Sequence, residues 1–149
     1  MRCFGIFSAL LLLSTSVGCV SLTPPEVEVT GLRPVATSQQ GGRFEISLAV
    51  SNPSSTPLPL PEASYRLRID GVGEYAYIDL PAMVVGAKQT QNLRLPAAIA
   101  GRAADLADRP WSVRGSLVYE PDRPIRKFLT ETGAPLPRVL FDGEGKVSR

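Results

Sequence analysis

Hydrophobic and polar residues alternate along most of the chain after residue 25. The clearest run is FEISLAVS at residues 44–51, in which Phe44, Ile46, Leu48 and Val50 share one face. A period of two is typical of a β-strand with one buried face. Weaker alternation or a β-rich composition predicts further strands at residues 26–32, 64–70, 74–80, 91–96, 111–119 and 137–141. The chain is therefore expected to consist mainly of strands.

The one-sided pattern also indicates how these strands are arranged. Antiparallel sheets with one wet face alternate in this way, whereas the strands of parallel sheets read as continuous apolar runs. Two antiparallel sheets can bury their apolar faces against each other. We therefore expect an all-β fold, an immunoglobulin- or fibronectin type III-like antiparallel β-sandwich of about seven strands, over residues 26–145, followed by a tail at 146–149. No Cys…Trp…Cys pattern is present, which excludes a disulfide-bonded antibody-type domain.

A proline-rich stretch interrupts the alternation after the best strand. Asn52 and Pro53 come first, and Pro57, Pro59 and Pro61 follow. Because proline cannot donate to a β-ladder, a central strand is excluded here, and Asn52 with Pro53 should end the preceding strand. We expect a stiff, extended crossover to the next strand. The functional alternative is a PxxP-type recognition motif.

Two other segments lack the period of a strand. Residues 96–108, PAAIAGRAADLAD, are rich in alanine and predict a short helix. Residues 120–128, EPDRPIRKF, mix both charges with two prolines and predict an exposed loop. Its cations, Arg123, Arg126 and Lys127, are candidates for contact with anionic lipid headgroups.

The first residues of the chain read as a targeting segment. An apolar run of about ten residues is too short to span a membrane and fits the h-region of a secretory signal peptide. The SVGC sequence at its end resembles the bacterial lipobox, although Ser16 stands where a leucine is usual. The resemblance implies a signal peptide at 1–18 cleaved after Gly18, a lipidated Cys19, and a short tether at 19–25. The alternative is a plain signal peptide or an uncleaved anchor, with the cysteine incidental.

The lipobox resemblance also implies a location. Lipidation of Cys19 would make the membrane a partner and place the domain in a bacterial cell envelope, close to the membrane surface. By the sorting rules of such lipoproteins, Val20 lacks the aspartate that favours retention in the inner membrane. In a host with two membranes, the periplasmic face of the outer membrane is therefore expected.

Composition argues against catalysis. The 149-residue chain has no histidine, and its two cysteines, Cys3 and Cys19, both lie near the start. It contains no P-loop, no GxSxG elbow and no dinucleotide-binding motif. Several carboxylates are spread over segments without strand periodicity and are interpreted as surface charge: Asp105, Asp108, Glu120 and Asp122. We expect no enzymatic activity, no cofactor and no metal, and the net charge of +2 gives no reason to expect nucleic acid binding.

The aromatic residues raise a carbohydrate-binding alternative. Trp111 and Tyr119 fall on the same predicted face as Val113, so we interpret them as core residues. A solvent-open row of aromatic rings on one sheet would favour a binding module instead.

The order of these segments resembles a known family, the water-stress and hypersensitive-response (WHy) domain of the late embryogenesis abundant (LEA) group 2 proteins. The resemblance spans most of residues 25–143 and rests on PEVEVTGL at 25–32, FEISLAVSNP at 44–53, YRLRIDG at 65–71, VRGSLVY at 113–119 and LFDGEG at 140–145. Ser54 departs from a frequent second asparagine, and Gly71 and Gly73 match the usual glycine-rich hairpin only in part.

The family resemblance has consequences for both fold and function. It implies a fibronectin-like sandwich without enzymatic activity, in which Asn52 and Pro53 terminate a strand. Family members are linked to desiccation or stress protection, and many bacterial ones are envelope lipoproteins. The sequence therefore predicts a non-catalytic, lipid-anchored envelope protein with a protective or binding role. The alternative is a fibronectin-like binding module unrelated to stress, with a carbohydrate or protein partner.

Overall fold

The computed structural model describes residues 23–37, 41–100 and 106–147 of the chain. Within these ranges it consists of nine strands and a helix: β1 (Glu26–Thr37), β2 (Gly41–Ser51), β3 (Leu58–Leu60), β4 (Glu62–Ile69), β5 (Gly73–Asp79), β6 (Met83–Val85), β7 (Thr90–Ala100), β8 (Pro110–Val118), α2 (Arg123–Thr132) and β9 (Arg138–Lys146).

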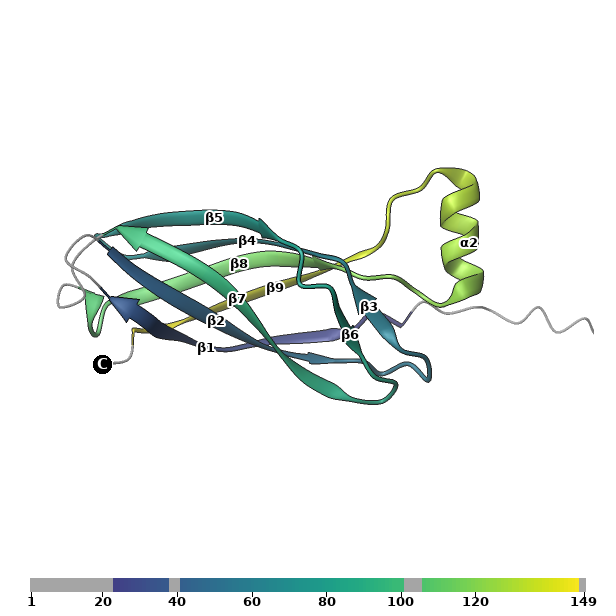
Figure 1. Ribbon diagram of the computed structural model, residues 1–149, viewed down its shortest axis with the longest axis horizontal. Helices are drawn as coiled ribbons and strands as arrows, with labels where there is room; N and C mark the ends of the chain where they lie inside the picture. The colour runs from purple at the N-terminus through teal and green to yellow at the C-terminus, as the bar shows by residue number, and fades with distance from the viewer. Residues whose placement is uncertain (1–22, 38–40, 101–105, 148–149) are drawn as a thin grey trace, which may run out of the picture.

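The strands form an elongated antiparallel sandwich (Figure 1). One sheet has the order β1-β2-β7, the opposite sheet has the order β5-β4-β8-β9, and β3 and β6 form a separate two-stranded ribbon. At one side β1 lies against β9, where a Cβ on Gly143 would come within 2.5 Å of Val29 Cβ. The predicted all-β sandwich is confirmed.

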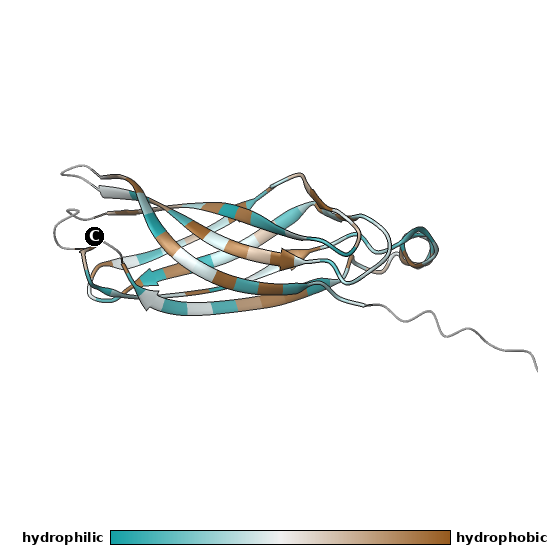
Figure 2. Ribbon diagram, turned by 90° about the horizontal axis from the view of Figure 1, so that it is seen from below, coloured by the Kyte–Doolittle hydropathy of each residue, from teal (hydrophilic) through white to brown (hydrophobic). Residues whose placement is uncertain are grey.

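The core lies between the two sheets. Along β2 every second side chain is buried, and Ile46, Leu48 and Val50 are fully buried. Leu67 on β4 and Leu117 on β8 are equally inaccessible from the opposite sheet. Figure 2 shows the resulting alternation of hydrophobic and hydrophilic bands along the long strands. The period of two in the sequence therefore arises because each sheet has one buried face and one face exposed to water.

Each of the seven predicted strand segments overlaps an observed strand, and four of them extend one residue beyond it. The helix predicted at 96–108 is wrong at residues 96–100, whereas Leu106 is helical. β7 continues to Ala100, and its residues 96–100 pair with residues 41–45 of β2. Ala97 and Ile99 are buried in strand alternation. Helix propensity of alanine is a weak local preference, and an available sheet edge overrides it. Residues 101–105 lie outside the described part of the chain.

The loop predicted at 120–128 is also corrected, because most of it belongs to the helix α2. A proline in the first turn begins this helix, as its fixed φ allows. Gly133 ends it in the left-handed conformation, with φ of 69°, and the amide of Ala134 donates to Leu129 O at 3.0 Å. The mixed charges indicated exposure correctly, but the two prolines were read as loop signals when one of them is a helix start.

The proline-rich stretch crosses from one sheet to the other, as predicted, and it also contains a strand. β3 pairs only with β6, so it is not part of a central ladder, and Pro59 stands opposite Val84. The flanking Leu58 and Leu60 are buried. Proline is tolerated because this ribbon leaves its nitrogen without a required partner, while its carbonyl oxygen accepts the Glu120 amide at 3.0 Å.

Candidate functional site

A turn stabilised by Asn52 lies at one end of the sandwich. β2 ends at Ser51, and the Asn52 side chain that follows is only 2% exposed. Its Oδ1 accepts the Ser54 amide at 3.0 Å. Its Nδ2 lies 2.8 Å from Thr56 O, 3.2 Å from Val85 O and 3.1 Å from Gly86 O. One side chain thus closes the local turn and connects it to the end of β6, which satisfies buried backbone carbonyls.

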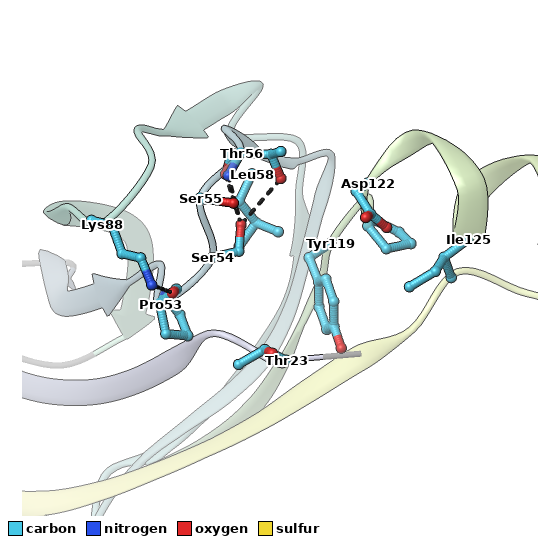
Figure 3. Close-up of a pocket in the computed structure, with 11 residues that line it drawn as sticks. Thr23, Pro53, Ser54, Ser55, Thr56, Leu58, Lys88, Tyr119, Asp122 and Ile125 are labelled. Carbon is cyan, nitrogen blue, oxygen red and sulfur yellow. Dashed lines mark hydrogen bonds between the residues drawn. The ribbon is translucent and has the colours of Figure 1, made fainter. Parts of the chain in front are cut away.

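A cavity of about 290 Å³ opens between this turn and α2 (Figure 3). The wall is formed by residues from four segments of the chain: Thr23, Pro53, Ser54, Ser55, Thr56, Leu58, Lys88, Tyr119, Pro121, Asp122 and Ile125. Lys88 Nζ donates to the carbonyl oxygen of Pro53. The Tyr119 ring separates the turn from the helix, and its burial raises the pKa of its hydroxyl. Thr23, four residues after Cys19, lines the same cavity as Asp122 and Ile125 at the start of α2.

Helix α2 projects from the same end of the sandwich and buries none of its side chains (Figure 1). Its apolar and polar residues lie on different sides, as Figure 2 shows almost down the helix axis. Ile125 and Leu129 are half-buried, whereas Phe128 is 62% exposed. The polar side carries three cations, Arg123, Arg126 and Lys127.

Two of these cations have carboxylate partners. Arg126 contacts Glu120 at 2.8 Å and Lys127 contacts Glu131 at 3.7 Å, both on the surface. Such exposed pairs contribute less than about 1 kcal/mol and can exchange for other anions. The sequence prediction that these cations are exposed is correct, and the helix that presents them was missed.

A second opening lies at the side of the sandwich where β5 approaches β7. Tyr75 and Tyr77 of β5 stack there with ring centroids 5.9 Å apart, and Tyr65 of β4 meets Tyr77 edge-on at 6.3 Å. The Tyr65 hydroxyl donates to Pro96 O. A cleft of about 530 Å³ runs along Tyr75 and Tyr77 toward Asp79.

The surroundings of this cluster raise the pKa of two of its tyrosines, Tyr65 and Tyr75. Burial raises the pKa of Tyr65 well above its usual value, and the nearby Tyr75 and Asp79 add to the effect. Burial also raises the pKa of Tyr75, with smaller contributions from Tyr77 and Asp79. Tyr65 and Tyr75 therefore remain neutral hydrogen-bonding and stacking groups at physiological pH. Sequence reasoning missed the cluster, although the i, i+2 spacing of Tyr75 and Tyr77 placed them on one face.

The remaining predicted residues fall into two groups, those outside the described ranges and those in the core. Gly18, Cys19 and Asp105 lie outside the described residues. Trp111 and Tyr119 are buried with Val113, as expected of core residues. The Trp111 Nε1 is buried without a hydrogen-bond partner. In the part of the chain that the structure describes, no group of three or more acidic or cysteine side chains is arranged to hold a metal, and no helix is long and apolar enough to cross a membrane.

Comparison with known proteins identifies the fold. No family model and no curated protein matches the sequence. A solution structure of an Arabidopsis thaliana protein is similar over 87% of this chain and 85% of its own, with 20% identity and a TM-score of 0.54. The solution structure of a candidate late embryogenesis abundant protein covers 84% of this chain and 72% of its own, with 20% identity and a TM-score of 0.55. The resemblance seen in the sequence is thus confirmed at the level of the fold, which is an LEA-like β-sandwich.

Proposed function

We propose that this protein is a non-catalytic domain of a bacterial cell envelope, anchored to a membrane through lipidated Cys19 and serving a protective or binding role under stress. The observation that carries the anchor is the position of Cys19, which follows a signal-peptide-like segment and precedes Thr23 by four residues. Thr23 is already part of the folded end of the sandwich. The LEA-like fold supports the stress-related role.

The physical basis of the anchor is the number of acyl chains. Each buried methylene contributes about 0.8 kcal/mol, and one chain alone holds a protein only marginally. The two or three chains of a bacterial lipoprotein cysteine give stable attachment. In a host with two membranes, Val20 after the cysteine favours the periplasmic face of the outer membrane.

Mass spectrometry of the protein purified from membranes tests the anchor. The expected result is a chain that begins at Cys19 and carries the mass of its acyl groups. A mature chain with another N-terminus, or an unmodified cysteine, would refute it. The stress role is tested separately by survival of a deletion strain after drying and osmotic shock, with the wild-type gene returned as the control; unchanged survival would remove that part of the proposal.

A second candidate function is a binding module that uses the tyrosine cleft. The observation in its favour is the stacked, partly open pair Tyr75 and Tyr77, since flat sugar faces and apolar side chains pack on such rings. Titration with soluble peptidoglycan fragments and with polysaccharides would test it. Tyr77→Ala should abolish binding and Ala76→Ser, on the opposite face of β5, should not. Equal behaviour of the two variants would exclude the cleft.

A further inference from the structure

We infer that α2 is a membrane-docking helix that lies in the headgroup layer of the membrane holding Cys19, with Phe128 and Leu129 toward the acyl chains and its cations at the phosphates. This inference rests on the proposed anchor. It adds a second, non-covalent attachment that orients the sandwich on an anionic lipid surface.

The first support is distance along the chain. Thr23 lines the same cavity as Asp122 and Ile125, which belong to the start of α2. Thr23 lies four positions after Cys19 in the sequence, a stretch that spans at most about 14 Å when fully extended. A helix of ten residues is itself about 15 Å long. Attachment at Cys19 therefore holds Thr23, and with it the end of the sandwich from which α2 projects, close to the lipid headgroups.

The second support is the exposed apolar side of α2. Phe128 is 62% exposed and Leu129 is only half-buried, while Ile125 is turned to the cavity wall. An aromatic and a leucine side chain on one side of a helix, with cations on the other, is the composition of helices that lie in a membrane interface. The sandwich covers this side only in part and leaves Phe128 open, because α2 projects from its end (Figure 1).

The third support is charge. The helix carries Arg123, Arg126 and Lys127 against the single carboxylate of Glu131. Glu120 and Glu131 are surface partners of Arg126 and Lys127, and phosphates of a lipid surface can take their place or join them. Arg123 has no ion pair among the described residues and extends the cationic side to the start of the helix.

The test places an environment-sensitive thiol probe at Phe128→Cys in the full-length lipoprotein, reconstituted in vesicles of phosphatidylcholine with or without phosphatidylglycerol. We expect the probe emission to move to shorter wavelength and to be quenched by lipids labelled in the acyl chain, more strongly in the anionic vesicles. The matched control variant is Val35→Cys, at an exposed position on β1. Nine residues along this strand place it about 30 Å from Glu26. A probe there should report water in both vesicles.

Charge removal tests the role of the cations. Each cation near an anionic surface is expected to change the ratio of inserted to free helix about fivefold. Arg123→Gln with Lys127→Gln should therefore remove most of the preference of the Phe128 probe for anionic vesicles. The control pair Arg68→Gln with Arg114→Gln makes the same change of charge on the outer face of the four-stranded sheet and should have no effect.

The possible outcomes distinguish this inference from the anchor. Because acylation blocks Cys19, one probe per chain together with the acyl mass shows that the anchor is intact. An intact anchor with a water-exposed probe at position 128 overturns the docking of α2 alone, and two probes per chain overturn the anchor. A probe that becomes buried in native envelope membranes but stays in water in pure lipid vesicles would mean that a protein covers α2, which also overturns the inference.

Discussion

Strand β2 and helix α2 are both amphipathic, but only β2 has its apolar face covered. Every second side chain of β2 is buried between the two sheets, and Leu48 is completely inaccessible. In α2 the apolar side chains recur at helical spacing, yet none is buried and Phe128 is largely exposed. The two segments follow the same rule of one apolar and one polar side.

The difference shows what amphipathicity does and does not specify. A periodic pattern fixes which side of an element avoids water, because apolar area removed from water is stabilising. It does not fix whether the covering surface belongs to the same chain. For β2 the cover is the opposite sheet, whereas the described residues cover the apolar side of α2 only in part and leave Phe128 exposed, a place that we assign to a lipid surface.

The largest expected effect contrasts core truncation in the two elements. Leu48→Ala should lower the free energy of unfolding by about 2–5 kcal/mol, because it leaves a cavity between the sheets. Phe128→Ala removes a larger side chain but should lower it by less than about 0.5 kcal/mol, since that side chain is exposed. Urea denaturation of both variants measures the difference. A comparable loss in the two would mean that α2 is packed in the protein and would contradict the contrast.

A smaller effect is expected for polar contacts. Asn52→Ala should cost about 2 kcal/mol, because the carbonyl of Val85 is left buried without its donor, and Asn52→Asp should cost more because it turns an acceptor toward three carbonyls. Glu120→Gln, which breaks the exposed pair with Arg126 beside α2, should cost less than about 1 kcal/mol. Asn92→Ala on the wet face of β7 is the control and should be neutral. If Asn52→Ala were as mild as that control, the buried turn would not stabilise the sandwich.

The smallest effect concerns Tyr65 and depends on pH. Tyr65→Phe removes the hydrogen bond to Pro96 O and should cost about 1 kcal/mol at neutral pH. Folding raises the Tyr65 pKa above its unfolded value of about 10. In alkali the unfolded chain therefore loses the Tyr65 proton before the folded protein does, which favours unfolding. The contribution of the protonated hydroxyl is therefore complete below about pH 10 and is lost as pH rises above it.

The pH dependence can be measured in the same denaturation experiment. Stability of the wild-type protein should decline above about pH 10, and Tyr65→Phe should decline less steeply. Glu120→Gln, beside the exposed α2, should follow the wild-type curve. Parallel curves for wild type and Tyr65→Phe would contradict the burial of the tyrosine hydroxyl.

Sequence reasoning succeeded where a local pattern and its partner agree. The alternation of Phe44, Ile46, Leu48 and Val50 requires a face that is covered, and the other strands of the same chain supply it. It failed at residues 96–100 because alanine prefers a helix by only a small free energy, while pairing with β2 satisfies a whole row of backbone groups. It also failed at α2, where Pro124 in the first turn was read as a loop signal rather than as a helix start.

The candidate sites illustrate the same limit. That Asn52 with Pro53 would follow the end of a strand was readable from the chain, since both residues act on their own backbone. The contacts of Asn52 with Val85 and Gly86 were not readable, because they join positions more than thirty residues apart. The tyrosine cleft needs β5 to lie at the side of its sheet facing β7, which no spacing of residues specifies.

The sequence by itself determined the class of fold, the face each long strand buries and the stop after β2. These properties depend on residue type and short-range periodicity. Only the tertiary structure decided that Thr23, the Asn52 turn and α2 meet at one end of the sandwich, and that the helix leaves Phe128 exposed. The physical reason is that contacts between distant segments depend on strand order and register. These are set by the packing of the whole chain rather than by any one segment.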